Sequence, residues 1–304
     1  MNFIKHTKIY FLFSGILILS SLIALGVFGL KPSIEFSGGS ILEIEYIEER
    51  PSNQEIQDQL SEFDLGNIII QPTGEKGVII RTKDITEETH QTIIEKLREN
   101  RELEQLRYEN IGPIIGQELK DKTKIIIVLS LLAIVLYIAF AFRRVQRPIK
   151  SWQYGLASLV ALSHDVLIPL GVFAVLGEFY GVEISIPIIV ALLTVLGYSI
   201  NNTVVVFDRI RENLSLHRTP HQDLVGGGGG FDEVVDVSLN QTLTRSINTS
   251  LTTLFVLSAI FFFGGETLKY FALALMLGIT AGTYSSLFLA SPVLVWWLKR
   301  RQKI

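Results

Sequence analysis

The sequence predicts an α-helical polytopic membrane protein with six transmembrane helices and one small α+β domain between the first two. Of its 304 residues, 48% are hydrophobic and only 19% are charged, whereas soluble domains carry about 25% charged residues. The apolar residues lie in six long runs, and about 20 apolar residues suffice to cross a bilayer. The acidic residues concentrate in one stretch, 31–122, which holds 20 acidic and 11 basic residues.

Composition also excludes several classes of protein. The chain has no cysteine, so it has no disulfide framework, thiolate metal site or cysteine nucleophile. Its formal net charge of −3 gives no basic field for nucleic acid. We therefore expect no nucleic-acid partner, no metal and no cofactor, with membrane lipid as the surroundings.

The six apolar runs alternate with loops that differ in charge. The runs are Ile9–Leu30, Ile125–Phe142, Tyr154–Leu176, Ile184–Phe207, Ile247–Phe263 and Phe271–Leu298. Lysine and arginine gather before the first run, after every second run and after the last, and loops rich in these residues stay in the cytoplasm. Both termini are then cytoplasmic. Residues 1–30 hold the N-terminus and first span, 31–122 the exported domain, and 123–304 five further spans with a cytoplasmic loop at 208–244.

The exported stretch has the pattern of a small α+β domain. Strands are expected at 40–47, 67–71, 77–82 and near 105–111, and helices at 53–63 and 87–100. This order, β-α-β-β-α-β, is that of the ferredoxin-like arrangement. Thr86 is followed by acidic residues, which is typical of a helix N-terminus.

The loop between the fourth and fifth runs contains five consecutive glycines, Gly226–Gly230. Such a run holds neither helix nor strand at low cost, so it indicates a flexible connector. The apolar pattern that begins at Phe231 predicts a short amphipathic helix along the inner membrane face.

Polar residues interrupt three of the apolar runs, and each such group inside a bilayer needs a partner. His164 and Asp165 lie near the middle of the third run. Helical spacing places Arg245, Asn248, Thr249 and Thr252 on one face of the fifth. The fourth run carries Ser199, Asn201, Asn202 and Thr203.

Depth and spacing predict that the polar faces around Asn202 and Asn248 meet. Amides and hydroxyls of this kind also join helices without any further role, at roughly 0.6 kcal/mol per pair. Asp165 is the stronger candidate for function, because a carboxylate is costly in lipid and is a natural proton carrier. His164 and Asp165 are neighbours about 100° apart on a helix, so they cannot both point at the same partner.

Five short motifs, in order along almost the whole chain, resemble the SecF members of the SecD/SecF family of bacterial protein-export membrane proteins. The segments are Phe36–Ser40, Ile111–Leu119, His164–Asp165, Gly197–Asn213 and Gln241–Ser246. Their most distinctive residues are Phe36, Gly38, Gly39, Gly112, Pro113, Gly116, Gly197, Tyr198, Ser199, Asp208 and Arg209.

The resemblance implies a subunit that pairs with SecD, with six spans of the type found in RND transporters. Such a complex works with the SecYEG channel in the plasma membrane and helps to move preproteins by the proton-motive force. The chain has no Walker A motif, which agrees with a machine that does not use ATP. The resemblance further implies that Arg245 belongs to the proton-carrying network.

One position departs from the family pattern. The family commonly has an aspartate where this chain has Asn202, and an amide does not take up or release a proton near neutral pH. Either the proton passes through a carboxylate of SecD, aided by Asp165, or this variant couples differently or not at all.

Two other classes of protein stay open at this point. One is a structural subunit that stabilises SecD without a proton-carrying role of its own. The other is half of an RND-type small-molecule exporter, although the single small exported domain speaks against it. An enzyme is the weakest hypothesis, because no nucleophile accompanies His164 and Asp165.

Overall fold

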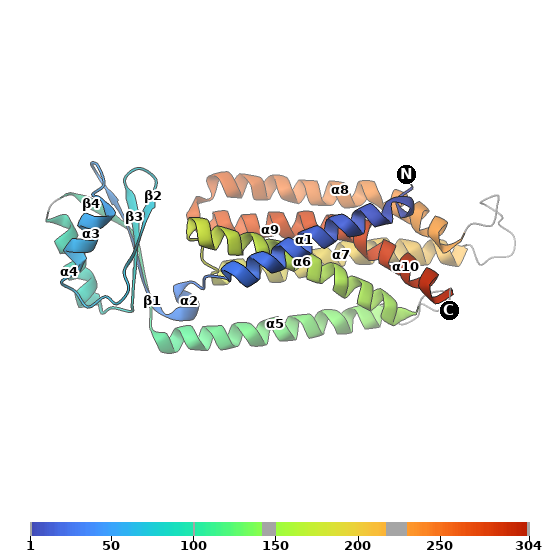
Figure 1. Cartoon of the computed structure of the whole chain (residues 1–304), viewed down its shortest axis with the longest axis horizontal. Helices are drawn as coiled ribbons and strands as arrows, with labels where there is room; N and C mark the ends of the chain where they lie inside the picture. The colour runs from blue at the N-terminus through green and yellow to red at the C-terminus, as the bar shows by residue number, and fades with distance from the viewer. Residues whose placement is uncertain (1, 100, 142–149, 217–229, 303–304) are drawn as a thin grey trace. The chain divides into compact units, whose positions relative to one another are not determined.

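The computed structural model describes residues 2–99, 101–141, 150–216 and 230–302 (Figure 1). The chain divides into two compact units. We call residues 1–30, 127–178 and 187–304 the helical unit, and residues 31–126 with 179–186 the sheet unit.

The sheet unit contains one four-stranded antiparallel sheet. Its elements follow the order expected from the sequence: β1 (Gly39–Tyr46), α3 (Asn53–Leu60), β2 (Ile69–Thr73), β3 (Gly77–Thr82), α4 (Glu87–Arg98) and β4 (Leu103–Ile111). The strands lie in the order β2-β3-β1-β4, and β1 is central with partners on both edges. The helices α3 and α4 pack against each other and cover one face of the sheet (Figure 1).

Alternation along β1 builds the core of this unit. Leu42, Ile44 and Tyr46 are all buried against the two helices, because side chains two apart on a strand share a face. Burial raises the pKa of Tyr46 to about 12. Both helices begin at capped residues, as the sequence indicates for α4: the Thr86 hydroxyl accepts from the Thr89 backbone N–H at 3.3 Å.

Two of the sequence motifs pack against each other at the start of β1. The short helix α2 (Ile34–Ser37) ends at Gly38, whose φ of +74° favours glycine. A Cβ on Gly38 would lie 2.9 Å from Pro113 Cα, and one on Gly116 would lie 2.8 Å from the Gly38 nitrogen. Glycine is therefore required where the first turns of α5 (Pro113–Ala141) meet this segment.

The sheet unit also includes the loop that connects α6 to α7. Ile184 and Pro32 form a parallel bridge, and the Ile184 N–H donates to the Lys31 carbonyl at 2.7 Å. Arg81 on β3 forms an ion pair with Glu183 at 3.0 Å. Burial raises the pKa of Glu183, although the nearby Arg81 charge opposes this.

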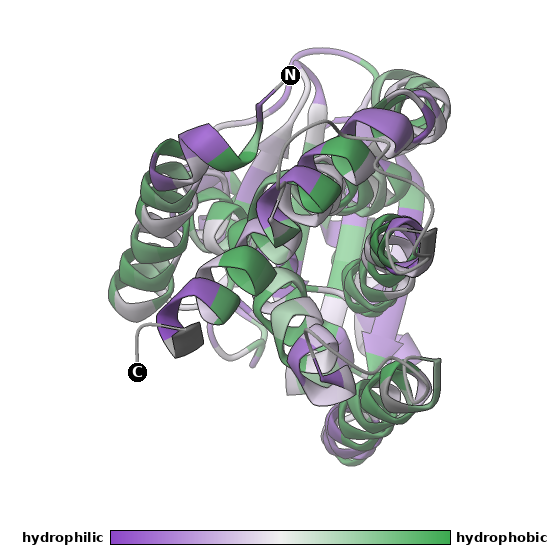
Figure 2. Cartoon of the chain, turned by 90° about the vertical axis from the view of Figure 1, so that its right-hand side faces the viewer, coloured by the Kyte–Doolittle hydropathy of each residue, from purple (hydrophilic) through white to green (hydrophobic). Residues whose placement is uncertain are grey.

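Long apolar helices make up the helical unit. They are α1 (Thr7–Phe28), the C-terminal part of α5, α6 (Ser151–Tyr180), α7 (Ile186–Leu216), α8 (Phe231–Phe263), α9 (Gly265–Ser285) and α10 (Ser291–Gln302). One turn of π-helix, Ser286–Ala290, joins α9 to α10. In Figure 2 hydrophobic colouring covers most of these helices.

Five stretches in the described part of the chain are long and apolar enough to cross a membrane. They are Ile4–Phe28, Ser151–Tyr180, Ile186–Ser215, Phe231–Phe263 and Leu268–Arg300. The last stretch runs through α9, the π turn and α10, which therefore act as a single long helix.

The segment after the glycine run differs from the sequence prediction. No separate amphipathic helix begins at Phe231, because α8 continues unbroken from Phe231 to Phe263. Its buried positions Val235, Leu239 and Thr242 lie three or four residues apart and so keep to one face. Gly226–Gly229 lie outside the described residues, and Gly230 is the N-cap residue of α8.

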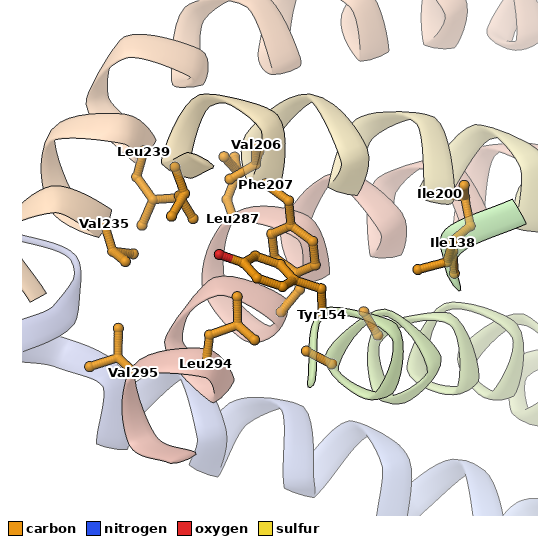
Figure 3. Close-up of a cluster of buried hydrophobic side chains, with 14 of the residues drawn as sticks. Ile138, Tyr154, Ile200, Val206, Phe207, Val235, Leu239, Leu287, Leu294 and Val295 are labelled. Atoms are coloured by element: carbon orange, nitrogen blue, oxygen red, sulfur yellow. The ribbon is translucent and has the colours of Figure 1, made fainter. Parts of the chain in front are cut away.

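A cluster of buried apolar side chains holds the helices together at one end of the unit (Figure 3). Tyr154 of α6 and Phe207 of α7 meet edge to face with ring centroids 5.1 Å apart. Val235 and Leu239 of α8 reach the same cluster, as do Leu294 and Val295 from α10. This packing fixes the register of α6 against α7, on which the polar site depends.

Candidate functional site

A fully buried carboxylate lies at the middle of α6. Asp165 has no exposed surface, and both of its oxygen atoms are hydrogen-bonded. Oδ2 accepts from the Ser285 hydroxyl at 2.8 Å and from the Ser199 hydroxyl. Oδ1 lies 2.9 Å from His164 Nδ1. Residues from α6, α7 and α9 thus converge on one acid.

Glycine and a change of helix type bring these groups together. A Cβ on Gly282 would lie 3.0 Å from Ser199 Cβ and 3.4 Å from Asp165 Oδ2, so a larger residue would crowd the site. The π turn begins at Ser286, directly after the hydroxyl that binds Asp165. Single π turns inside helices recur at functional sites. Gly278, one helical turn before Gly282, also has no room for a side chain, because an added Cβ would collide with Val195.

His164 and Asp165 contact each other, although neighbouring residues on a helix point about 100° apart. The imidazole of His164 is fully buried and stacks on the Tyr284 ring with centroids 5.8 Å apart. In the described part of the chain, His164 Nε2 has no hydrogen-bond partner. The two side chains therefore form a pair. Asp165 contacts the neighbouring helices through Oδ2, and His164 contacts them through the face of its ring.

Further hydroxyl contacts join the helices of this bundle, apart from those that bind the carboxylate. Thr203 and Ser286 are joined at 2.9 Å, and Tyr198 donates to Ser250 at 3.2 Å. The hydroxyls of Ser250 and Thr283 are 2.6 Å apart.

Sequence reasoning did not single out Ser285, Ser286, Ser250 or Thr283. A weak signal for the first two was present, because Gly278, Gly282 and Ser285 or Ser286 follow at helical spacing. The partners of a serine in an apolar helix depend on how neighbouring helices are rotated, which the sequence does not show.

The two asparagines of α7 have different environments. Asn201 is exposed on the chain, whereas Asn202 is only 7% exposed. Asn202 Nδ2 has no hydrogen-bond partner among the described residues. Asn202, which stands where the family commonly has an aspartate, is thus a buried polar side chain that faces the interior of the bundle.

The polar face of α8 that carries Arg245 points outward. Arg245, Asn248, Thr249 and Thr252 are all exposed on the chain. Thr249 and Thr252 donate to carbonyl groups of their own helix, at 2.9 and 3.0 Å. No hydrogen bond joins this face to Asn202 in the described residues, so the expected meeting of the two faces is not found within this chain.

A different stripe of α8 faces the interior. Ser238, Thr242, Ser246 and Ser250 are buried at intervals of four residues. Small side chains at an interface let helix backbones approach closely, whereas an arginine at the same place would hold the helices apart. The buried face is therefore rotated by about one residue from the face that the sequence predicted to be inside.

The remaining motif residues of α7 lie toward its C-terminal end or facing outward. Arg209 Nε donates to Gln241 of α8 at 2.6 Å, and Asp208 pairs with Arg211. The Arg209–Gln241 hydrogen bond joins α7 to α8 at this end. At Gly197, by contrast, an added Cβ would meet no atom within 4 Å.

The chemistry of the site is that of an acid and a base held out of water. A carboxylate bound by two hydroxyls and an imidazole can hold and pass a proton. No group of three or more acidic, histidine or cysteine side chains suited to a metal occurs in the described part of the chain.

Long apolar helices around a buried acid and base define a multi-pass membrane protein with an ionisable site at mid-helix. Two family models match the chain. Residues 91–300 match the protein-export membrane protein SecD/SecF, C-terminal, and residues 23–46 match the SecD/SecF GG motif. The chain belongs to the SecD/SecF family.

Curated relatives match over nearly their whole length. The protein translocase subunit SecF of Thermobaculum terrenum is 38% identical, covering 98% of this chain and 94% of the relative. The SecF subunit of Synechocystis is 35% identical, covering 99% and 95%. That of Vibrio alginolyticus is 37% identical, covering 96% and 88%.

Solved structures show the same fold. The crystal structure of SecDF, a translocon-associated membrane protein from Thermus thermophilus, superposes with a TM-score of 0.83 at 32% identity. It covers 99% of this chain, while this chain covers 39% of SecDF. SecDF in its super-membrane-facing form gives a TM-score of 0.68 at 33% identity, again over 39% of that chain.

Proposed function

We propose that the chain is the SecF-type subunit of a Sec translocase accessory complex in the bacterial plasma membrane. Together with SecD and next to the SecYEG channel, it promotes preprotein translocation with the proton-motive force. The observation that carries this proposal is the fully buried His164–Asp165 pair in a chain whose relatives are named SecF over nearly their whole length.

The proposal includes six spans, a ferredoxin-like exported domain and cytoplasmic termini. Residues 125–141 of α5 carry no charge, which supports a sixth span beside the five apolar stretches. The antiparallel order β2-β3-β1-β4 and the sequence of elements support the ferredoxin-like arrangement. Lysine and arginine in alternate loops support the orientation.

SecD is the proposed partner for the exposed face of α8. A charged group within a span requires a partner or water, and Arg245 has neither an acid nor a buried environment within the described part of this chain. A carboxylate from SecD fits that position. The matching SecDF structures, in which this fold makes up 39% of the chain, support a partner of this kind.

Gradient-dependent export in membrane vesicles tests the proposed function. With SecD and SecYEG present, Asp165→Asn is expected to reduce the stimulation by the proton gradient at neutral pH. Asn202→Ala is expected to perturb packing mainly. Ser163→Ala, on the exposed side of the same turn of α6, is the matched control and should export like the unmodified chain.

A structural role is the second candidate, and Asn202 is the observation that favours it. An asparagine in place of the family acid carries no proton. If the chain only stabilised SecD, Asp165→Asn and Arg245→Ala would leave gradient dependence unchanged as long as the complex assembled. Such a result would exclude the proton-coupling role.

A further inference from the structure

Three neighbouring groups bind the carboxylate of Asp165. Oδ2 lies next to the hydroxyls of Ser199 and Ser285, and Oδ1 lies 2.9 Å from His164 Nδ1. Hydrogen bonds that donors make to the charged form of an acid favour that form. The carboxylate of Asp165 therefore already serves as the acceptor for its neighbours.

The imidazole of His164 has one nitrogen in use and one without a partner. Nδ1 faces Asp165 Oδ1, while Nε2 is buried with no hydrogen-bond partner among the described residues. If Nδ1 carries the hydrogen, it donates to the carboxylate and leaves a bare lone pair on Nε2. The other tautomer would leave a buried N–H without an acceptor, which proteins tolerate less well than an unused acceptor.

We propose that His164 Nε2 is the atom of this chain that accepts the proton, with Asp165 as its fixed counter-ion. The inference rests on the proposed function and deepens it, because it assigns the two roles within the pair. Imidazole is the side chain that ordinarily changes charge between pH 5 and 8. The adjacent carboxylate offsets the positive charge that protonation creates inside the bundle.

The step moves one proton and no electrons. A hydronium ion from the acidic side transfers its proton to the Nε2 lone pair and leaves water behind, which gives an imidazolium. Release of the Nε2 proton to water on the other side restores the neutral ring. Because His164 is fully buried here, both transfers require conformations in which water reaches Nε2.

The other groups around the ring do not compete for the proton. Tyr284 on α9 stacks on the imidazole, and its hydroxyl donates to the Tyr10 carbonyl of α1 at 3.0 Å. From α7 and α9 the nearest polar groups at the pair are the serine hydroxyls that bind Asp165. Asp165 is the one charged side chain with a contact to His164 in the described part of the chain.

If His164 accepts the proton and Asp165 is its counter-ion, variants of the two residues should differ in how proton uptake depends on pH. The complex with SecD is reconstituted in liposomes that contain a pH-sensitive dye, and proton uptake is recorded under an imposed gradient at several pH values. His164→Asn keeps an amide N–H that can bind Asp165 but cannot take up a proton, so uptake should be lost at every pH. Asp165→Asn keeps the imidazole and should keep uptake, with a profile shifted to lower pH because the imidazolium loses its counter-ion.

The reverse pattern would overturn the inference: uptake abolished by Asp165→Asn but only shifted by His164→Asn makes Asp165 the carrier. Normal uptake by His164→Asn would also overturn it. Failure of the proposed function is a separate outcome, in which the unmodified complex itself shows no gradient-driven uptake. Ser163→Ala serves as the unaffected control.

A measurement on the unmodified complex covers the case in which His164→Asn fails to fold. Solid-state nuclear magnetic resonance of the complex with ¹⁵N-labelled histidine, in liposomes, reports which ring nitrogens carry hydrogen. The inference requires that the His164 ring carry hydrogen on Nδ1 alone at high pH and on both nitrogens at low pH. A His90→Gln complex separates this signal from that of His90, which is also buried. A His164 ring that keeps the same single hydrogen across this range would contradict the inference.

Discussion

At the level of single residues, Asp165 can be buried at mid-helix because each of its oxygen atoms has a hydrogen-bond donor. The donors come from three helices, so the charge is held only when α6, α7 and α9 are packed together. A buried acid without partners costs several kcal/mol. If these helices separated, the carboxylate would lose its donors, so its burial depends on the packing of the bundle.

Removal of one donor should destabilise the bundle measurably. Ser285→Ala takes away the hydroxyl 2.8 Å from Asp165 Oδ2 and leaves only Ser199 on that oxygen. A hydrogen bond to a charged group contributes about 1.5–3 kcal/mol. Thermal unfolding in detergent measures the loss. The control is Ser163→Ala, because the Ser163 hydroxyl binds only its own helix, at the Leu159 carbonyl. Equal melting temperatures for both variants would contradict the account.

The sequence identifies Asp165 as exceptional but not the residues that hold it. An acid in an apolar run stands out by its cost in lipid, whereas Ser285 resembles any helix-packing serine. Its role depends on the rotation of α9 against α6. His164 and Asp165 contact each other although their Cβ atoms point about 100° apart on the helix, because rotation about the side-chain bonds brings the two polar ends together.

At the scale of helices, glycine sets the distance between α7 and α9. An added Cβ on Gly278 would lie 2.3 Å from Val195 Cγ2, so Gly278→Ala must push the helices apart. Overpacking of this kind costs about 1–3 kcal/mol. The control is Gly15→Ala in α1, where an added Cβ meets nothing within 4 Å. We expect a lower melting temperature for Gly278→Ala only, and an unchanged value would contradict the packing described.

Helical periodicity predicts the two polar faces of α8 but not which of them is inside. Arg245 and Ser246 are adjacent, and a rotation of about 100° exchanges their environments. The structure buries the small residues and leaves the guanidinium on the surface of the chain. A single sequence does not contain the partner that would cover Arg245.

The loop between α6 and α7 should respond to pH through Glu183. Its pKa is raised by burial, so the folded loop binds a proton more tightly than an unfolded one. The linked stability is therefore greatest below the ordinary value of 4.5 and declines as pH rises through the raised pKa. Hydrogen exchange at Ile184 and Ile186, corrected for intrinsic rates, should slow on acidification. Glu183→Gln should abolish this response, and an unchanged response in that variant would exclude Glu183 as its source.

At the scale of the whole molecule, the exposed face of α8 should govern assembly with SecD. Arg245→Ala removes the charge that the proposed partner acid would meet, so co-purification with SecD should weaken, by about tenfold or more if the pair is buried. Arg98→Ala, on an exposed surface of α4, is the matched control. Equal recovery of SecD with both variants would show that the Arg245 face is not the interface.

Much of the overall plan is predictable from hydropathy and charge, because lipid imposes long apolar helices. Confirmed on this basis are the family and five apolar helices long enough to cross a membrane, together with the order of elements in the sheet unit. The continuous α8 was not foreseen, because its polar first turns resemble a surface segment. Helices in membrane proteins extend beyond the bilayer when neighbouring helices pack against their ends.

We propose that the His164–Asp165 pair couples this chain to the proton gradient. The most direct measurement is proton uptake by liposomes that contain SecD with either the unmodified chain or the double variant His164→Asn/Asp165→Asn. Both preparations must show the same assembly by size-exclusion chromatography. We expect gradient-driven uptake with the unmodified chain and none with the double variant. Equal uptake by the two preparations would contradict it.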